Sequence, residues 1–421
     1  MGHGLWTKMK FTADLHIHSK YSRATSKNLD IDHLVLWAKK KGVDLLATGD
    51  YLHPLWLKEL KAKLEPTGQG LFVNDGVHFM LSCEISNIYS KRGKTYRNHT
   101  LILAPDFKTV DEIIKALTAR GVNLNSDGRP IMGIDIKDVT KLVLDINERC
   151  FIIPAHVWTP WFSMYGSKSG FNSLEECFED MAAKITCVET GLSSDPPMNW
   201  RLSELDRLTL VSNSDAHSPS KIGRECNVFD CQLSYDDMID TLKTKDRKRL
   251  VQTIEFFPEE GKYHYDGHRA CGVSFSPEES KKNNNRCPTC GEPLILGVMY
   301  RVDELADRPV GYKPKDPVPF VNRIPLAEII ADVKGVGVSS KAVQSEYEAL
   351  VHQFGNELKI LSDVARKEFP KSVSPKIVEG IMRVREGNVH IEPGYDGEYG
   401  KIKIFEEDEE LATGEKQIRL F

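Results

Sequence analysis

The sequence predicts an α/β protein, in which a barrel of parallel strands with outer helices is followed by a small cysteine-containing region and a helical region. Three observations lead to this prediction. Residues 9–255 alternate strand-like apolar runs with amphipathic helical stretches, which is typical of sheets covered by helices. Polar side chains that suit metal ions recur where the strand-like runs end. Three closely spaced cysteines and then a glycine turn between two helical stretches follow the barrel.

The composition is that of an ordinary globular protein of several domains, with 421 residues of which 28% are charged. No apolar run approaches the ~20 residues that would span a bilayer, and the N-terminus lacks the apolar segment of a signal peptide. We therefore expect a cytoplasmic protein without a membrane partner, whose nine cysteines are reduced. The net charge of -5 does not indicate a nucleic-acid partner, although a local basic patch would.

The elements follow from the spacing of apolar residues. The runs 43–47, 77–81 and 150–153 are expected to be buried strands, and 31–39 and 110–117 carry apolar side chains at helical spacing. A composition break at 256–261 and a proline-rich stretch from Pro309 to Pro319 separate the later regions. We expect a barrel domain at 1–255, a small domain at 256–312, a helical domain at 313–405 and a flexible acidic tail at 406–421.

Two short motifs pair metal-binding side chains at strand ends. His16 and His18 are two residues apart, so an extended chain turns both toward one face, and Asp215 and His217 repeat this spacing. Further candidate ligands lie between the two motifs, most of them directly after a strand-like run. Since strand ends are where sites assemble in α/β folds, one shared metal cluster is expected. Its predicted ligands are His16, His18, Asp50, His53, Glu84, His99, His156, Asp215 and His217.

Imidazole and carboxylate ligands suit zinc, manganese or iron, and the ligand types alone do not choose among them. Two such ions, or three, can lower the pKa of a shared water and stabilise charge on a phosphoryl group, with Mg²⁺ as a further candidate for activity. Glu84 is expected to bridge two ions. We expect Glu84, His156 and Asp215 to act directly in catalysis.

The small second region carries soft ligands at the spacing of a structural zinc site. Cys287 and Cys290 form one knuckle, and His268 with Cys271 forms the other. His264 is the alternative to His268 as the fourth ligand. Such a closed site is expected to stabilise a segment too small to fold alone.

Residues 333–341 predict a glycine hairpin between two helices. Gly335 and Gly337 would let backbone N–H groups approach a DNA phosphate, with Lys334 beside them. A plain packing turn between two helices is the alternative.

Two loops near the predicted metal site have side chains that suit DNA. Residues 90–97 contain Lys91, Arg92, Lys94 and Arg97 and no acidic residue, so they suit a phosphate backbone, although such loops are often merely solvated. Residues 157–165 are aromatic, and their tryptophans could stack on an unpaired base or pack as a lid. The tryptophans are Trp158 and Trp161.

At this point a family resemblance is visible. Residues 12–255 resemble the PHP family of metal-dependent phosphoesterases through Asp14–Ser19, Glu84, His99, His156 and Asn213–His217. The resemblance implies a distorted seven-stranded β/α barrel with up to three metal ions. Where many members have an Asp-His pair, this chain has Asp50 and His53, so one or both would supply that ligand, and Ala24 stands where many members have a further histidine. Glu189 is a further ligand or an acceptor for a ligand imidazole.

The order of barrel, zinc knuckles and glycine hairpin resembles the endonuclease Q family over residues 9–400. The resemblance implies a DNA repair nuclease that nicks double-stranded DNA on the 5′ side of uracil, hypoxanthine, xanthine or an abasic site. Two alternatives stay open: a PHP phosphatase for a small phosphate ester, and a DNA-binding scaffold with an inactive barrel.

The chain ends in Lys416–Phe421, which resembles a shortened form of the peptide that binds the sliding clamp. Gln417–Phe421 is therefore a candidate clamp-binding segment at the end of an acidic stretch. A tail that merely ends in two apolar residues is the alternative.

Overall fold

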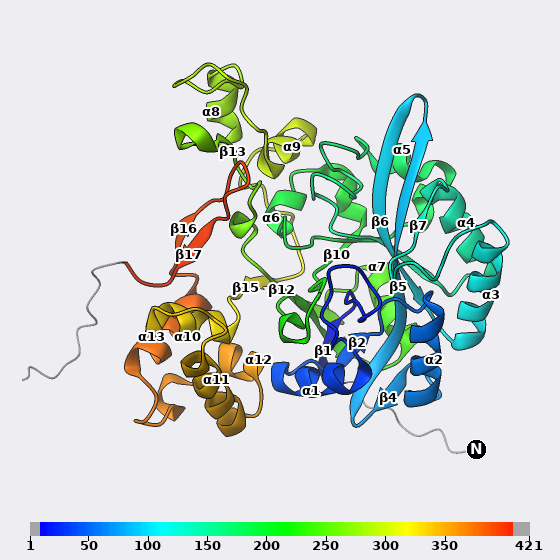
Figure 1. The fold of residues 1–421 in the computed structure, drawn as a ribbon, viewed down its shortest axis with the longest axis horizontal. Coiled ribbons are helices and arrows are strands. Elements are labelled where there is room, and N and C mark those ends of the chain that lie inside the picture. Colours follow the sequence, from blue (N-terminus) through cyan, green and yellow to red (C-terminus); the bar gives the residue numbers. More distant parts are fainter. Residues whose placement is uncertain (1–8, 407–421) are drawn as a thin grey trace, which may run out of the picture.

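The structure is a computed structural model and describes residues 9–406 of the chain. The ribbon divides into a barrel domain (blue to green), a small region above it (yellow-green) and a helical region beside it (orange) in Figure 1. Two apolar clusters fill the barrel domain, and a third fills the helical region. The acidic tail beyond 406 and the candidate clamp-binding segment lie outside the described residues.

The barrel domain is built on one sheet of eleven strands. Strands β1 (Met9–Asp14), β2 (Leu45–Ala47) and β5 (Val77–Lys91) are parallel neighbours. Strands β11 (Cys226–Cys231) and β12 (Leu250–Glu255) continue the sheet from β1 in antiparallel order. The remaining strands of this domain are β3 (Glu65–Pro66), β4 (Phe72–Asn74), β6 (Lys94–Ala104), β7 (Ile131–Met132), β8 (Phe151–Pro154) and the separate parallel pair β9 (Cys187–Glu189) and β10 (Thr209–Val211).

The predicted α/β barrel is confirmed as a barrel-like core, but the expectation that its strands are all parallel is wrong. β5 and β6 form a long hairpin that rises from the body of the domain in Figure 1. Its turn at Arg92 and Gly93 has positive φ angles of 52° and 79°. Strands joined by so tight a turn must be antiparallel. The expected basic loop at 90–97 is therefore the end of this hairpin.

Helices cover the sheet where helical spacing predicted them. The expected helix at 31–39 is α1 (Ile31–Lys41), and the expected helix at 110–117 lies within α3 (Phe107–Thr118). Asp30 caps α1 by accepting a hydrogen bond from the His33 N–H, and Gly42 ends it with φ 85°. The other helices of the domain are α2 (Pro54–Lys63), α4 (Ile136–Ile146), α5 (Leu174–Phe178), α6 (Pro196–Asn199) and α7 (Tyr235–Thr244).

The small region, which follows the barrel domain and precedes the helical region in the sequence, consists of a hairpin and two short helices. The hairpin pairs β13 (Asp266–His268) with β14 (Val273–Phe275). Helix α8 (Pro277–Lys282) begins with a capping box of Ser276 and Glu279, and α9 (Val298–Leu305) packs beside it.

The helical region contains α10 (Leu326–Lys334), α11 (Lys341–Phe354), α12 (Glu357–Ser362) and α13 (Pro375–Glu386). β15 (Phe320–Asn322) precedes these helices and pairs in parallel with β12 of the barrel. After α13 the chain returns to the small region as a hairpin of β16 (His390–Glu392) and β17 (Lys401–Lys403). There Tyr395 bridges to Tyr265, and the Arg269 N–H donates to Asp396.

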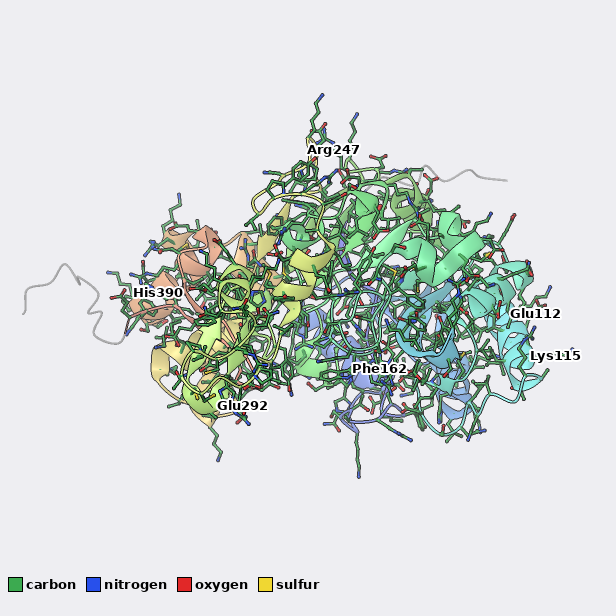
Figure 2. All side chains as sticks on the ribbon, turned by 90° about the horizontal axis from the view of Figure 1, so that it is seen from above. Glu112, Lys115, Phe162, Arg247, Glu292 and His390 are labelled. Carbon is green, nitrogen blue, oxygen red and sulfur yellow. The ribbon has the colours of Figure 1, made fainter. Side chains whose placement is uncertain are left out.

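The barrel and the helical region occupy opposite ends of the molecule. In the view of Figure 2, Glu112 and Lys115 of α3 lie at one end and His390 of β16 at the other. Among the described helices, none is long and apolar enough to cross a membrane.

Candidate metal centre

His16 and His18 follow β1 and are fully buried. The Nε2 atoms of both imidazoles face Asp215, at 3.5 Å and 3.0 Å from its Oδ1. Glu84 of β5 lies on the same side, with its Oε2 3.6 Å from His16 Nε2 and 3.3 Å from His18 Nε2. These four side chains form one group with the ligand atoms within 4.8 Å of one another.

A second group shares Glu84 with the first. Its other members are His99 on β6 and His156 directly after β8. Glu84 Oε1 lies 2.7 Å from His99 Nδ1 and 3.1 Å from His156 Nε2. One Glu84 oxygen faces each group, so the two groups share this carboxylate.

Contacts between strand ends bring the two sequence motifs together. The Leu15 N–H donates to Asn213 Oδ1, and the Ser214 N–H donates to Asp14 Oδ1. Asp215 and His156 both have positive φ angles, 45° and 30°, which non-glycine residues rarely adopt. Such strained backbone is typical of functional sites, where surrounding contacts hold it.

The donor set fits metal ions. His16 Nε2 is buried and has no hydrogen-bond partner, although its Nδ1–H donates to Glu189 at 3.0 Å. The Nδ1–H of His18 donates likewise to Asp50 at 3.1 Å, and His156 Nδ1 lies 3.1 Å from Thr159 Oγ1. A metal-binding histidine usually has its second ring nitrogen fixed by an acceptor in this way.

Local charges keep Glu84, and burial keeps His99, in the form that binds metals, whereas nearby carboxylates raise the pKa of His16, His18 and His156 although burial opposes this. Burial alone would raise the pKa of Glu84, but His99, Arg129 and His16 hold that pKa well below its ordinary value. Burial lowers the pKa of His99 to about 4. Carboxylate and neutral imidazole are the forms that coordinate metal ions.

Three predicted ligands lie outside both groups. The Asp50 carboxylate accepts hydrogen bonds from His18, the Ser19 N–H and the Ser22 hydroxyl, so it orients an imidazole. His53 stacks on Tyr21 with ring centroids 4.4 Å apart. The ring centroids of His217 and His18 are 4.7 Å apart, and His217 Nδ1 lies 2.8 Å from the Asp215 carbonyl oxygen.

The sequence predicts Glu189 to be either a further ligand or an acceptor for a ligand imidazole. It accepts a hydrogen bond from His16, as the second role requires. Sequence reasoning missed Arg129, whose Nη1 donates to Glu84 Oε2 at 2.9 Å. Arg129 lies in a loop between α3 and β7. No strand end or periodicity marks this position in the sequence.

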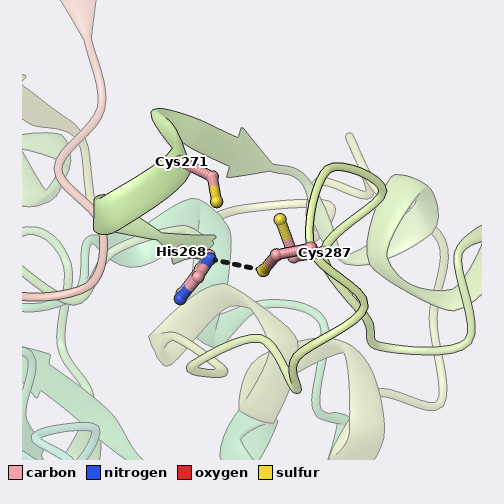
Figure 3. Close-up of side chains that lie close together, drawn as sticks. His268, Cys271 and Cys287 are labelled. Carbon is pink, nitrogen blue, oxygen red and sulfur yellow. Dashed lines mark hydrogen bonds between the residues drawn. The ribbon is translucent and has the colours of Figure 1, made fainter.

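The predicted zinc ligands converge in the small region. His268, Cys271, Cys287 and Cys290 place their ligand atoms within 4.8 Å of one another, and Figure 3, in which three of them are labelled, shows their side chains pointing toward one another. His268 Nδ1 lies 3.3 Å from Cys290 Sγ. Although burial opposes it, backbone N–H groups lower the pKa of Cys287 to about 6, which favours the metal-binding thiolate. His264 is buried outside the group.

The whole described chain resembles a solved lesion-specific endonuclease, PfuEndoQ from Pyrococcus furiosus. The two are 34% identical with a TM-score of 0.85, over 95% of this chain and 96% of that one. This chain belongs to the endonuclease Q family.

Two further relatives extend the comparison. A solved endonuclease Q bound to a 27-mer duplex substrate with an abasic lesion at the active site is 34% identical, with a TM-score of 0.83 over 95% of this chain and 98% of that one. The uncharacterized protein YqxK of Bacillus subtilis is 30% identical over 410 residues, which are 94% of this chain and 99% of that protein.

The uncharacterized protein MJ0043 of Methanocaldococcus jannaschii is 38% identical over 252 residues, which are 59% of this chain. The match covers 31% of that protein, so this chain spans about a third of the length of that relative. The family model of the MJ0043 C-terminal domain matches residues 325–388, the segment that contains helices α10 to α13.

Several side chains that we expected to contact DNA have other partners. Lys91 forms ion pairs with Asp135 at 2.9 Å and Glu179 at 2.7 Å. Lys94 donates to the Gly170 carbonyl oxygen at 2.8 Å. Arg92 is exposed at the end of the β5–β6 hairpin, and Arg97 is partly buried on β6.

The prediction for Trp158 is wrong, because this side chain is 1% exposed and donates its indole N–H to Asn199 at 2.8 Å. Trp158 is a core residue, whereas Trp161 is 42% exposed. In the glycine hairpin Lys334 is paired with Glu346 at 3.1 Å. No atom lies within 4 Å of the place where a Cβ would stand at Gly335 or Gly337, so the space beside these glycines is open.

Proposed function

We propose that this protein is a DNA repair endonuclease that hydrolyses the phosphodiester on the 5′ side of a deaminated base or an abasic site in double-stranded DNA. One observation carries the proposal. The metal centre, the zinc knuckles and the glycine hairpin all lie in one chain that matches a lesion-specific endonuclease over 95% of its length. The barrel supplies the chemistry, and the two later regions supply surfaces for a duplex.

Two divalent ions, of zinc, manganese or iron, with Mg²⁺ as a further candidate, would be held by the two ligand groups that share Glu84. When bound, such ions lower the pKa of a water and stabilise charge on a phosphoryl group. The protein's own part is to fix geometry. Glu189 and Asp50 hold the imidazoles of His16 and His18, and the shared carboxylate of Glu84 keeps the two groups adjacent.

A pocket beside the metal centre suits an extruded base. Thr159, which contacts the ligand His156, is one wall of a pocket with a volume of about 400 Å³, within the ~300–1,000 Å³ typical of ligand sites. Its other walls include several aromatic rings and one lysine, which suits stacking on a base and pairing with a phosphate. They include Trp161, Lys262, Tyr263, His264 and Tyr399.

The pocket is held together across domains. Arg301 of α9 is 8% exposed, and its guanidinium donates to the carbonyl oxygens of Tyr165 and Phe171. It thereby fixes the loop that carries Trp161 to the small region. Lys262 lies over the rings of Tyr263 and Tyr399, at 5.6 Å and 5.8 Å from their centroids.

Both alternatives are less well supported. A phosphatase for a small ester needs neither zinc knuckles nor a glycine hairpin, and this chain has both. A scaffold with an inactive barrel would not need the complete ligand groups around Glu84.

The decisive experiment is an end-mapped nicking assay on labelled duplexes. Each duplex contains one uracil, hypoxanthine or abasic site, or none, and is incubated with Mg²⁺, Mn²⁺ or Zn²⁺. We expect one nick 5′ to each lesion, its loss in Asp215→Asn, and its retention in the control Asp145→Asn, an exposed carboxylate paired with Lys141. Equal cutting of undamaged DNA would contradict a repair role. Release of phosphate from small esters without nicking would favour the phosphatase, and DNA binding without cleavage would favour the scaffold.

Two finer proposals accompany this function. The segment Gln417–Phe421 would bind a sliding clamp, and the protein would act in the cytoplasm. A pull-down of clamp protein by the full chain, compared with a chain that ends at Lys416, tests the first.

A further inference from the structure

The loop between α3 and β7 is fastened directly against the metal-ligand motifs. The Gly128 N–H donates to the Tyr21 carbonyl oxygen at 2.9 Å, and the Ser86 N–H donates to the Pro130 carbonyl oxygen at 3.0 Å. Inside the loop, Asp127 accepts from the Arg129 N–H at 3.1 Å. The loop is therefore positioned by contacts on both sides of Arg129.

Gly128 is what permits this approach. A Cβ atom at this position would lie 2.3 Å from Asp50 Oδ2 and 2.4 Å from Ser22 Oγ. Asp50 in turn orients His18. A larger residue would therefore push the loop away from the ligands, and Arg129 with it.

This loop brings a guanidinium into the metal centre. Arg129 Nη1 lies 2.9 Å from Glu84 Oε2, while its side chain is still 22% exposed. Within the described residues, it is the one Lys or Arg that forms an ion pair with Glu84. It lies at the border between the buried ligands and solvent, where a substrate phosphate would enter.

The charges at the site favour an anion beside Arg129. Glu84 and Asp215 are the carboxylates among the ligands, and Glu189 and Asp50 lie behind His16 and His18, so two divalent ions would balance these four negative charges without an arginine. Nη1 of Arg129 binds Glu84, and the other N–H donors of the guanidinium would then be available to a substrate anion. Its planar fork of N–H donors matches the oxygens of a phosphate, and its charge is fixed.

We propose that Arg129 is a catalytic residue that binds a non-bridging oxygen of the scissile phosphate. The inference rests on the proposed nuclease function. Its alternative is a structural role, in which Arg129 only neutralises and positions Glu84.

The test compares Arg129→Gln and Arg129→Lys with the control Arg120→Gln, an exposed arginine just after α3 that donates to the Ala116 carbonyl oxygen. Single-turnover cleavage of an abasic-site duplex should fall by about 100-fold or more in Arg129→Gln, with partial recovery in Arg129→Lys. Metal content, measured by mass spectrometry, and the thermal midpoint should match the wild type. A loss of bound metal in Arg129→Gln would overturn the proposal in favour of the structural role.

A second measurement uses a methylphosphonate at the scissile linkage, which removes one charged oxygen. In the isomer that lacks the contacted oxygen, we expect the penalty of Arg129→Gln to shrink to a few-fold. Binding of the same duplexes by fluorescence anisotropy, in an Asp215→Asn background, should show the same pattern. If Arg129→Gln slows cleavage of the normal phosphate linkage and of this methylphosphonate linkage by the same factor, the proposed role of Arg129 is overturned. If the wild type cleaves no lesion duplex, the proposed nuclease function fails instead, so the two failures are distinguishable.

Discussion

Glu189 and His16 form a fully buried hydrogen-bonded pair, in which the imidazole Nδ1–H donates to the carboxylate at 3.0 Å. Glu189 also accepts from the backbone N–H of His156 at 2.9 Å and from the Asn213 side chain. One carboxylate therefore fixes parts of both ligand groups without belonging to either.

This relationship predicts the effect of Glu189→Gln. The amide can no longer offer two acceptor oxygens, so His16 and the backbone at His156 lose their fixed orientation. We expect metal affinity to fall about 10- to 100-fold while the protein stays folded. Isothermal titration with Zn²⁺ or Mn²⁺ measures the affinity. Glu255→Gln is the matched control, since Glu255 is equally buried but contacts Thr190 and Thr253 instead of a ligand. Equal affinities in the two variants would contradict the prediction.

The zinc knuckles predict a distinct phenotype for Cys290→Ser. The hairpin of β13 and β14 has only three residues in each strand and needs its metal to persist. We expect the protein to lose one zinc ion and its affinity for a lesion duplex, because Tyr263 and Lys262 near this region line the proposed base pocket. Metal analysis and anisotropy provide the readouts. Thr289→Ala alters the same knuckle without touching a ligand and should keep its zinc.

Part of this site could be predicted from sequence because one rule sufficed. The rule is that side chains at strand ends assemble into one site. His16 and His156 follow the ends of β1 and β8 and lie near each other, as the rule predicts. Glu84 and His99, in contrast, lie within β5 and β6 and reach the site from the middle of these strands. The rule does not predict which of the side chains near a strand end joins a ligand group and which binds a neighbouring residue instead. Asp50 is held by Ser19 and His18, so it lies behind the site.

Other features depend on tertiary packing and left no pattern in the chain. Arg129 reaches Glu84 because Gly128 packs against Asp50, a contact between residues far apart in sequence. The aromatic loop pattern did not separate Trp158, which packs in the core, from the exposed Trp161. The hairpin of β16 and β17 is too short to show an alternating pattern.

We expect the buried carboxyl group of Glu255 to make the stability of the protein depend on pH. Burial raises the pKa of this carboxyl group to about 7, above its ordinary value of 4.5. Between these two values the folded protein binds a proton that the unfolded chain has released, so stability falls as pH rises from 4.5 to about 7. Glu255→Gln removes this penalty. As pH rises from about 5 to about 8, we expect the thermal midpoint of Glu255→Gln to increase relative to that of the wild type. The increase should correspond to roughly 1–3 kcal/mol of unfolding free energy. Glu112→Gln on the surface of α3 should show no such trend.

The helical region is joined to the barrel by an ion pair of Lys41 and Glu357, with Nζ and Oε2 2.7 Å apart and side chains only 5% and 4% exposed. Lys41→Met leaves the Glu357 charge buried without its partner, although Tyr347 still donates to it. We expect a loss of about 3 kcal/mol or more and a separate early unfolding step of the helical region, measured by calorimetry and limited proteolysis. The double variant Lys41→Met/Glu357→Gln should recover part of this loss, because no charge then remains buried. Lys40→Met removes the neighbouring pair with Glu348, which is more exposed, and should cost less than about 1 kcal/mol. Equal losses for Lys41→Met and Lys40→Met would contradict a buried joint between the two regions.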